Sequence, residues 1–117
     1  MSAVRVMQTG RLATDPELKK VRRGPVQKTR VMLAVISNER WRDEWTEKTV
    51  ETSSTIRWIA WGARGENAVK YLKKGAWVAI TGHVRNNNYD GRDGKKVYGF
   101  QFTVDEVEYV ARANTEN

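Results

Sequence analysis

The strongest constraint on the fold is one segment that is apolar on both of its alternating faces. Residues Thr29–Ser37 read TRVMLAVIS and are rich in β-branched side chains, which favour an extended strand. The two faces carry, in turn, Val31, Leu33 and Val35, and Met32, Ala34 and Ile36. A half-exposed strand alternates apolar and polar residues instead. The segment therefore predicts a strand with a barrel interior on one face and a helix or a second subunit covering the other.

The rest of the chain supplies four more strand candidates and one helix. The strands are expected over Val4–Thr9, Thr55–Trp61, Trp77–Arg85 and Lys96–Tyr109, and the helix over Glu66–Lys74. The helix would carry an apolar stripe of Ala68, Val69 and Leu72, with Gly75 as its C-terminal cap. Three polar connections are expected: a basic hairpin or loop over Lys19–Arg30, a long charged excursion over Asn38–Ser54, and an exposed hairpin tip over Asn86–Gly94.

This order of elements indicates an all-β fold. Five strands with one short α-helix between the third and fourth match the oligonucleotide-binding (OB) fold, a five-stranded Greek-key barrel that binds across its second and third strands. We expect one domain over residues 1–110 and a short polar tail over residues 111–117.

Charge and residue usage narrow the function. The 117 residues carry a net charge of +7, which favours nucleic acid or another anionic surface as partner. The chain has no cysteine, and His83 is its only histidine, so a thiol–imidazole pair and multi-histidine zinc sites cannot be built from one chain. We expect no enzyme activity and no cofactor. A membrane-spanning apolar run and a secretory signal are also absent from the sequence, which predicts a cytoplasmic protein.

Aromatic residues repeatedly stand next to arginines. The pairs are Trp41 between Arg40 and Arg42, Trp61 close to Arg57, and Tyr89 close to Arg85. A protein that grips single strands without reading their sequence needs flat side chains for the bases and cations for the phosphates. One such pair is as often core and surface as it is a binding site, but three of them in a basic chain favour nucleic acid.

With these residues in view, the chain resembles bacterial single-stranded DNA-binding proteins from about Val4 to Val110. The resemblance is carried by G-x-L-x-x-D-P-E at Gly10–Glu17, NERWRDE at Asn38–Glu44, the Trp61-Gly62 pair, YLKKG at Tyr71–Gly75, VAITG at Val78–Gly82, and the DGRDGKKVY hairpin. It implies an OB barrel that wraps single-stranded DNA in replication, recombination and repair. It also implies a homo-oligomer, usually a tetramer built as a dimer of dimers, with replication or recombination proteins as further partners.

The resemblance also implies site residues. The stacking aromatics of the family fall on Trp41, Trp61 and Tyr89, the arginine of the third strand on Arg57, and the basic residues that end the helix on Lys73 and Lys74. The candidate DNA-contacting cations also include Arg42, Arg85 and Arg5. The basic Lys19–Arg30 segment is expected to help wrap the strand. Trp58 and Trp77 are interpreted as core or interface residues and His83 as an ordinary strand residue, whereas Trp45 stays undecided.

Two departures keep other functions open. Many family members carry a tryptophan where this chain has Thr55, and the family's acidic C-terminal tail is replaced by Ala-Asn-Thr-Glu-Asn. These features are expected of a tail-less paralogue, nucleoid-associated or encoded by a phage or plasmid, or of a trimmed chain. The alternatives are a primosome or replication-restart assembly factor and an RNA-binding OB protein.

Overall fold

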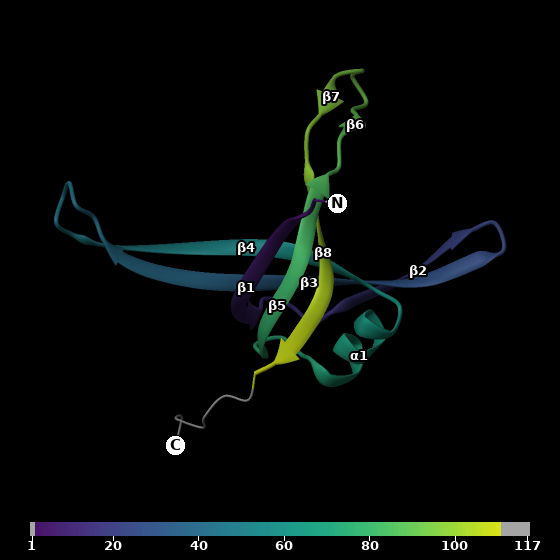
Figure 1. The fold of residues 1–117 in the computed structure, drawn as a ribbon, viewed down its shortest axis with the longest axis horizontal. Helices are drawn as coiled ribbons and strands as arrows, with labels where there is room; N and C mark the ends of the chain where they lie inside the picture. Colours follow the sequence, from purple (N-terminus) through teal and green to yellow (C-terminus); the bar gives the residue numbers. More distant parts are fainter. Residues whose placement is uncertain (1, 111–117) are drawn as a thin grey trace.

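The computed structural model describes residues 2–110 and shows a small barrel from which two long hairpins and a short ribbon project (Figure 1). The elements are, in chain order, β1 (Val4–Leu12), β2 (Glu17–Arg23), β3 (Val26–Arg42), β4 (Thr49–Trp61), α1 (Ala63–Tyr71), β5 (Trp77–Asn86), β6 (Tyr89–Asp90), β7 (Lys96–Val97) and β8 (Phe100–Tyr109). The polar tail expected over residues 111–117 lies outside the described residues.

Five of these strands close the barrel. The sheet order is β1-β5-β8-β4-β3, and the sheet closes where β1 pairs again with β3 at Arg11–Ile36 and Leu12–Val35. The β4–β8 pairing is parallel and short, from Trp58–Phe102 to Ile59–Thr103. Since α1 follows β4 and precedes β5, the predicted helix between the third and fourth barrel strands is confirmed, as is the five-stranded barrel.

The barrel interior is built on the segment that is apolar on both faces. Val31, Leu33 and Val35 are fully buried, and Trp58 of β4 is buried opposite Leu33. On the outer face Ala34 is also buried, whereas Met32 and Ile36 are only half-buried. The inner face therefore behaves as predicted, and the outer face keeps apolar surface in the single chain.

Strands β3 and β4 run far beyond the barrel. The segment Asn38–Ser54, expected as a charged excursion, instead continues both strands in one ladder from Arg30–Trp61 to Arg42–Thr49. Its polar side chains do not prevent pairing, because a two-stranded ribbon in water leaves both faces solvated. Pairing of β2 with β3 forms a second arm that turns at Gly24, whose φ of 60° suits glycine, so a hairpin is confirmed for Lys19–Arg30. Figure 1 shows the two arms pointing to opposite sides.

The helix begins and ends earlier than predicted. Helix α1 spans Ala63–Tyr71, so Lys73 and Lys74 follow it in a loop and Lys70 stands in its last turn. Ala68 and Leu72 are buried against the barrel, but Val69 is exposed, which corrects the predicted stripe. Within residues 2–110 no helix is long and apolar enough to cross a membrane.

The C-terminal strand is also shorter than predicted. Lys96–Tyr109 divides into β7, which pairs only with β6, and β8, which belongs to the barrel. The division falls at Tyr98 and Gly99, where the short ribbon leaves the barrel. At the N-terminal end, β1 passes Gly10 and continues to Leu12, because a side chain at Gly10 would meet the carbonyl oxygen of Ile36 and only glycine allows that approach.

Candidate nucleic-acid interface

Trp61 and a group of cations share the outer face of the β2–β3–β4 sheet. Residues opposite each other in an antiparallel ladder lie on one face, and the face repeats every second residue. Arg30 stands opposite Trp61, and Arg57 lies on the same face of β4. By the same register, Lys19, Arg23 and Lys28 of the β2–β3 arm belong to this face. The predicted pair of Trp61 and Arg57 is thus brought together, with the basic hairpin beside it.

Trp41 and Arg42 lie elsewhere, near the end of the β3–β4 arm. Trp41 stands opposite Val50 and is 46% exposed, so its indole is available to a ligand. Its position in the ladder puts it on the opposite face of the ribbon from Trp61. The neighbouring Arg40 donates to the carboxylate of Glu51 through Nε at 2.9 Å and also through its terminal nitrogen, which leaves Arg42 as the neighbouring arginine for which no such pairing is recorded.

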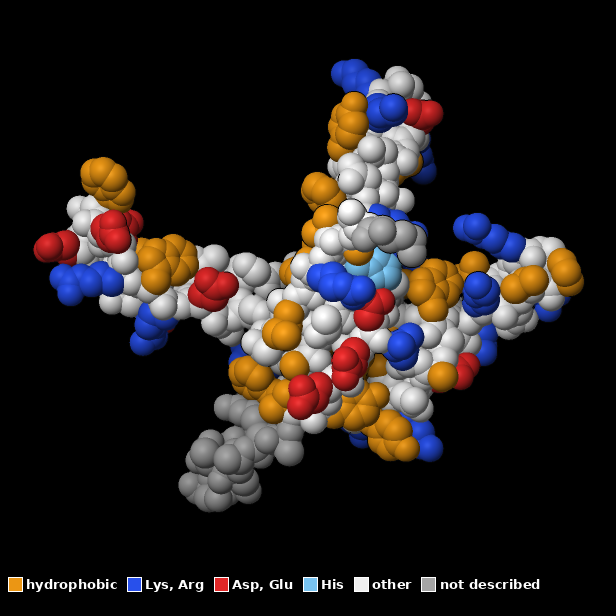
Figure 2. Space-filling model, in the orientation of Figure 1, with side chains coloured by type: hydrophobic (Ala, Val, Ile, Leu, Met, Phe, Trp, Pro, Cys, Tyr) orange, Lys and Arg blue, Asp and Glu red, His pale blue; other side chains and the backbone are white. Residues whose placement is uncertain are grey.

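Trp45 stands at the tip of this arm in acidic surroundings. Its side chain is 95% exposed, and its backbone N–H donates to the Asp43 carboxylate at 2.7 Å. Glu44 and Glu47 are its neighbours in the turn, and Figure 2 shows acidic side chains gathered at the end of this arm. Carboxylates repel phosphates at short range, so the tip is a poor platform for DNA despite its indole.

The third predicted aromatic, Tyr89, lies on the β6–β7 ribbon and is 58% exposed. Tyr98 and Phe100, expected on the inner face of one long strand, are 75% and 68% exposed where that ribbon joins the barrel. Sequence reasoning missed them as candidate platforms, because the alternation of the aromatics suggested a continuous buried face. The double turn signal of Asp90-Gly91 and Asp93-Gly94 was the available hint that the strand breaks there.

Arg5 and Arg85 lie on the β1–β5–β8 side of the barrel, where both take part in one polar network. The Nδ1 of His83 is 3.0 Å from the carboxylate of Asp105, and Arg85 lies 2.9 Å from the Nε2 of His83. Arg5 also approaches Asp105, at 3.5 Å. A neutral His83 that donates through Nδ1 and accepts at Nε2 satisfies both contacts. His83 is therefore the centre of this network rather than an isolated strand residue.

Lys73 and Lys74 lie on the loop that follows α1. The backbone N–H of Lys74 donates to the carboxylate of Asp15 at 2.7 Å, and Gly75 donates to the carbonyl of Leu12. These bonds tie the loop to the start of the β1–β2 connection. The predicted cations are consequently spread over several parts of the molecule, and Arg57 alone among them shares the face of Trp61. No cluster of residues suited to a metal ion is found within residues 2–110.

A closed five-stranded barrel with exposed aromatics and cations on its second and third strands is an OB fold, a class that binds oligonucleotides and oligosaccharides there. Within that class the sequence is more specific. The chain belongs to the single-strand binding protein family, whose sequence profile matches residues 3–110.

Individual relatives agree with this membership. The chain is 32% identical over 110 residues to a single-stranded DNA-binding protein of Bacillus cereus, covering 94% of this chain and 61% of that protein. It is 33% identical over 106 residues to single-stranded DNA-binding protein 3 of Listeria innocua, covering 91% of this chain and 62% of that protein. The chain thus spans about 61% of the length of such relatives.

A solved structure shares the fold. The Plasmodium falciparum SSB in complex with ssDNA superposes with a TM-score of 0.80 at 18% identity, covering 95% of this chain and 97% of that one. The fold is therefore conserved where most of the side chains differ.

Proposed function

We propose that this chain is a non-catalytic protein that binds single-stranded DNA without reading its sequence. The observation that carries the proposal is the half-exposed indole of Trp61 between Arg30 and Arg57 on the outer face of β3 and β4, in a member of the single-strand binding protein family. Bases stack on the indole and phosphates pair with the cations, and both contacts tolerate any base.

The proposed binding domain covers residues 1–110, and its stacking platforms are Trp61, Trp41 and Tyr89. The proposed phosphate contacts are Arg57, Arg42, Arg85, Arg5, Lys73 and Lys74, together with the basic β2–β3 arm. Because these groups lie on several parts of the molecule, a bound strand would have to pass around the barrel rather than cross one patch. We place this activity in the handling of single strands during DNA replication, recombination and repair.

The function is tested by comparing single-stranded with duplex DNA. Oligo(dT) should quench the tryptophan fluorescence strongly, whereas a duplex of equal length should bind more weakly, because its bases are already stacked on one another. Oligo(U) in the same titration distinguishes the RNA-binding alternative. Equal affinity for the duplex and the single strand would refute the proposal.

A second titration assigns the platforms. Trp61→Ala and Trp41→Ala should each weaken oligo(dT) binding by about 1–3 kcal/mol, the usual contribution of one base–aromatic stack. Trp45→Ala is the matched control, and its affinity should stay close to that of the unmodified protein because carboxylates surround the indole. Circular dichroism verifies that each variant is folded. A loss confined to Trp45→Ala would move the binding surface to the acidic tip.

A role as an assembly factor that holds other replication proteins is the second candidate. The observation that favours it is Trp45, an exposed indole at an acidic tip that suits a protein partner better than a phosphate backbone. If neither oligo(dT) nor oligo(U) binds, this candidate replaces the first.

We also propose a homo-oligomer, a tetramer built as a dimer of dimers. The half-buried Met32 and Ile36 and the 71% exposed Met7 leave apolar surface on the outside of the barrel, which a second copy would cover. Several copies on one particle raise the effective concentration of each weak site along one strand. Light scattering at micromolar concentration should give about four times 13.4 kDa. A mass of a single chain would contradict the proposal.

A further inference from the structure

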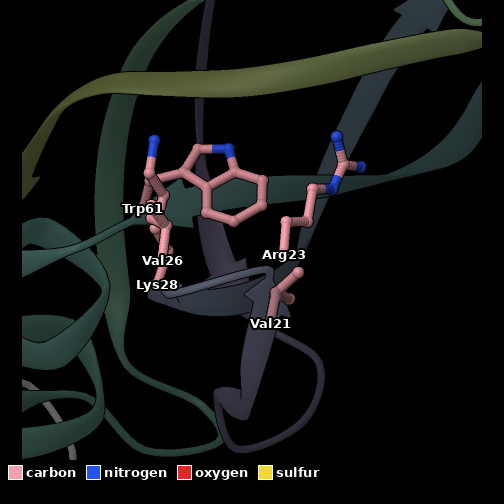
Figure 3. A pocket seen from close by; sticks show the side chains of 5 residues that line it. All are labelled: Val21, Arg23, Val26, Lys28 and Trp61. Atoms are coloured by element: carbon pink, nitrogen blue, oxygen red, sulfur yellow. The ribbon is translucent and has the colours of Figure 1, made fainter.

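A pocket of about 430 Å³ opens on the outer face of the sheet, between the β2–β3 arm and the end of β4. Its lining residues are Val21, Arg23, Val26, Lys28 and Trp61. In Figure 3 the indole of Trp61 and the side chain of Arg23 rise on opposite sides of the opening. Trp61 is thus one wall of an enclosed site rather than an isolated platform.

The register explains why these side chains meet. In the β2–β3 ladder Val21 stands opposite Lys28 and Arg23 stands opposite Val26, so all four project from one face. Two residues further along β3, Arg30 stands opposite Trp61, which puts the indole on that same face. The other face of the arm carries Lys20 and Arg22, which contact Thr29 and Gln27.

The chemistry of the lining selects the ligand. Trp61, Val21 and Val26 offer apolar surface, Arg23 and Lys28 offer positive charge, and none of the five residues that line the pocket is acidic. A flat apolar ring attached to a negatively charged chain satisfies both requirements, and a nucleotide unit of single-stranded DNA has this form. Volumes of this size are typical of sites for small organic groups.

We infer that this pocket holds one nucleobase of the bound strand between Trp61 and the two valines, while Arg23 and Lys28 contact the flanking phosphates. The inference rests on the proposed function and adds residues to it. It also gives the chain a base contact on the β2–β3 arm, where an aliphatic wall contributes contact area that Thr55 cannot supply on β4.

The test separates base contact from charge by changing the protein and the ligand together. The protein carries Val21→Ser with Val26→Ser, and the ligands are oligo(dT) and an abasic phosphodiester strand of equal length. Losing about one buried methyl group at each valine should weaken oligo(dT) binding about tenfold. The abasic strand should bind the variant as it binds the unmodified protein, since it has no base to place in the pocket. Val4→Ser, at an exposed valine on β1, is the control and should change neither affinity.

The cations are tested in the same format. Arg23→Ala with Lys28→Ala should weaken both strands, and by more than Lys20→Ala with Arg22→Ala, which removes equal charge from the opposite face of the arm. If the two charge variants weaken both strands equally, the phosphates do not follow the pocket and the assignment of Arg23 and Lys28 is wrong.

The outcomes distinguish the pocket from the function. If the unmodified protein binds oligo(dT) and the valine variant binds it equally well, the pocket holds no base and the proposed function stands. If the valine variant loses affinity for both strands alike, its effect is not base contact, and the inference is again overturned. If the unmodified protein binds neither strand, the proposed function itself fails.

Discussion

Replacing Trp58 with alanine will lower the free energy of unfolding by about 3–5 kcal/mol, the range for removing a large aromatic from a packed core. Trp58 has no exposed surface, and its ring meets the ring of Phe102 edge-on at 5.5 Å. The barrel is closed against it so tightly that a Cβ on Gly82 would lie 2.6 Å from the indole. Denaturant unfolding followed by circular dichroism measures the change.

A hydrogen bond adds to this loss. The indole N–H of Trp58 donates to the side-chain carbonyl of Gln8 at 2.7 Å, and Gln8 in turn donates to the backbone carbonyl of Val35 at 3.0 Å. Alanine leaves the buried Gln8 oxygen without its partner, which adds a desolvation cost to the cavity. Trp58→Phe is the matched control: it keeps most of the ring and loses only this bond, so it should cost less than alanine.

The same variant tests the assignment of faces on β4. Trp58 points into the barrel and Trp61 points out, so the folded fraction of Trp58→Ala should bind oligo(dT) with nearly the original affinity. A variant that unfolds normally but no longer binds DNA would show that the two tryptophans had been given each other's roles.

Raising the salt concentration from 50 to 200 mM will weaken binding of oligo(dT) by about 100-fold or more. The expectation follows from the cations on the face of Trp61, which are Lys19, Arg23, Lys28, Arg30 and Arg57. Each phosphate neutralised on a single strand contributes about −0.7 to the slope of log affinity against log salt, so these cations together give about −3.5. Titrations at several salt concentrations measure the slope, and contacts from Lys73 or Lys74 would make it steeper.

Single variants show which cations are responsible. Arg57→Ala should reduce the steepness of the slope by about 0.7. Lys70→Ala is the control, because this lysine lies on α1 with its ammonium 5.2 Å from the centre of the Tyr71 ring, and its slope should be unchanged. A salt-independent affinity would leave stacking as the whole mechanism and refute the role of the cations.

The faces of single strands could be predicted, but their lengths could not. The alternation in Thr29–Ser37 correctly put Val31, Leu33 and Val35 inside, and it correctly separated Trp58 from Trp61 on β4. The segment Asn38–Ser54 was too polar to look like strand, yet it pairs throughout, because a long ladder satisfies its backbone without any buried face. The helix was placed late for a similar reason: the apolar spacing marked its buried face but not its ends.

The sequence by itself determined the architecture and the kinds of residue at the candidate site. Hydrophobic period, turn residues and the order of elements depend on local chemistry, so the five-stranded barrel, its helix and the interleaved aromatics and cations could be read along the chain. Only the tertiary structure decided which of these residues meet. It placed Arg5 and Arg85 together around His83, moved Trp45 to an acidic tip, and joined Trp61 to Val21 and Val26. Such contacts depend on the register of strands far apart in the sequence, and one residue of slip would turn every one of these side chains to the other face.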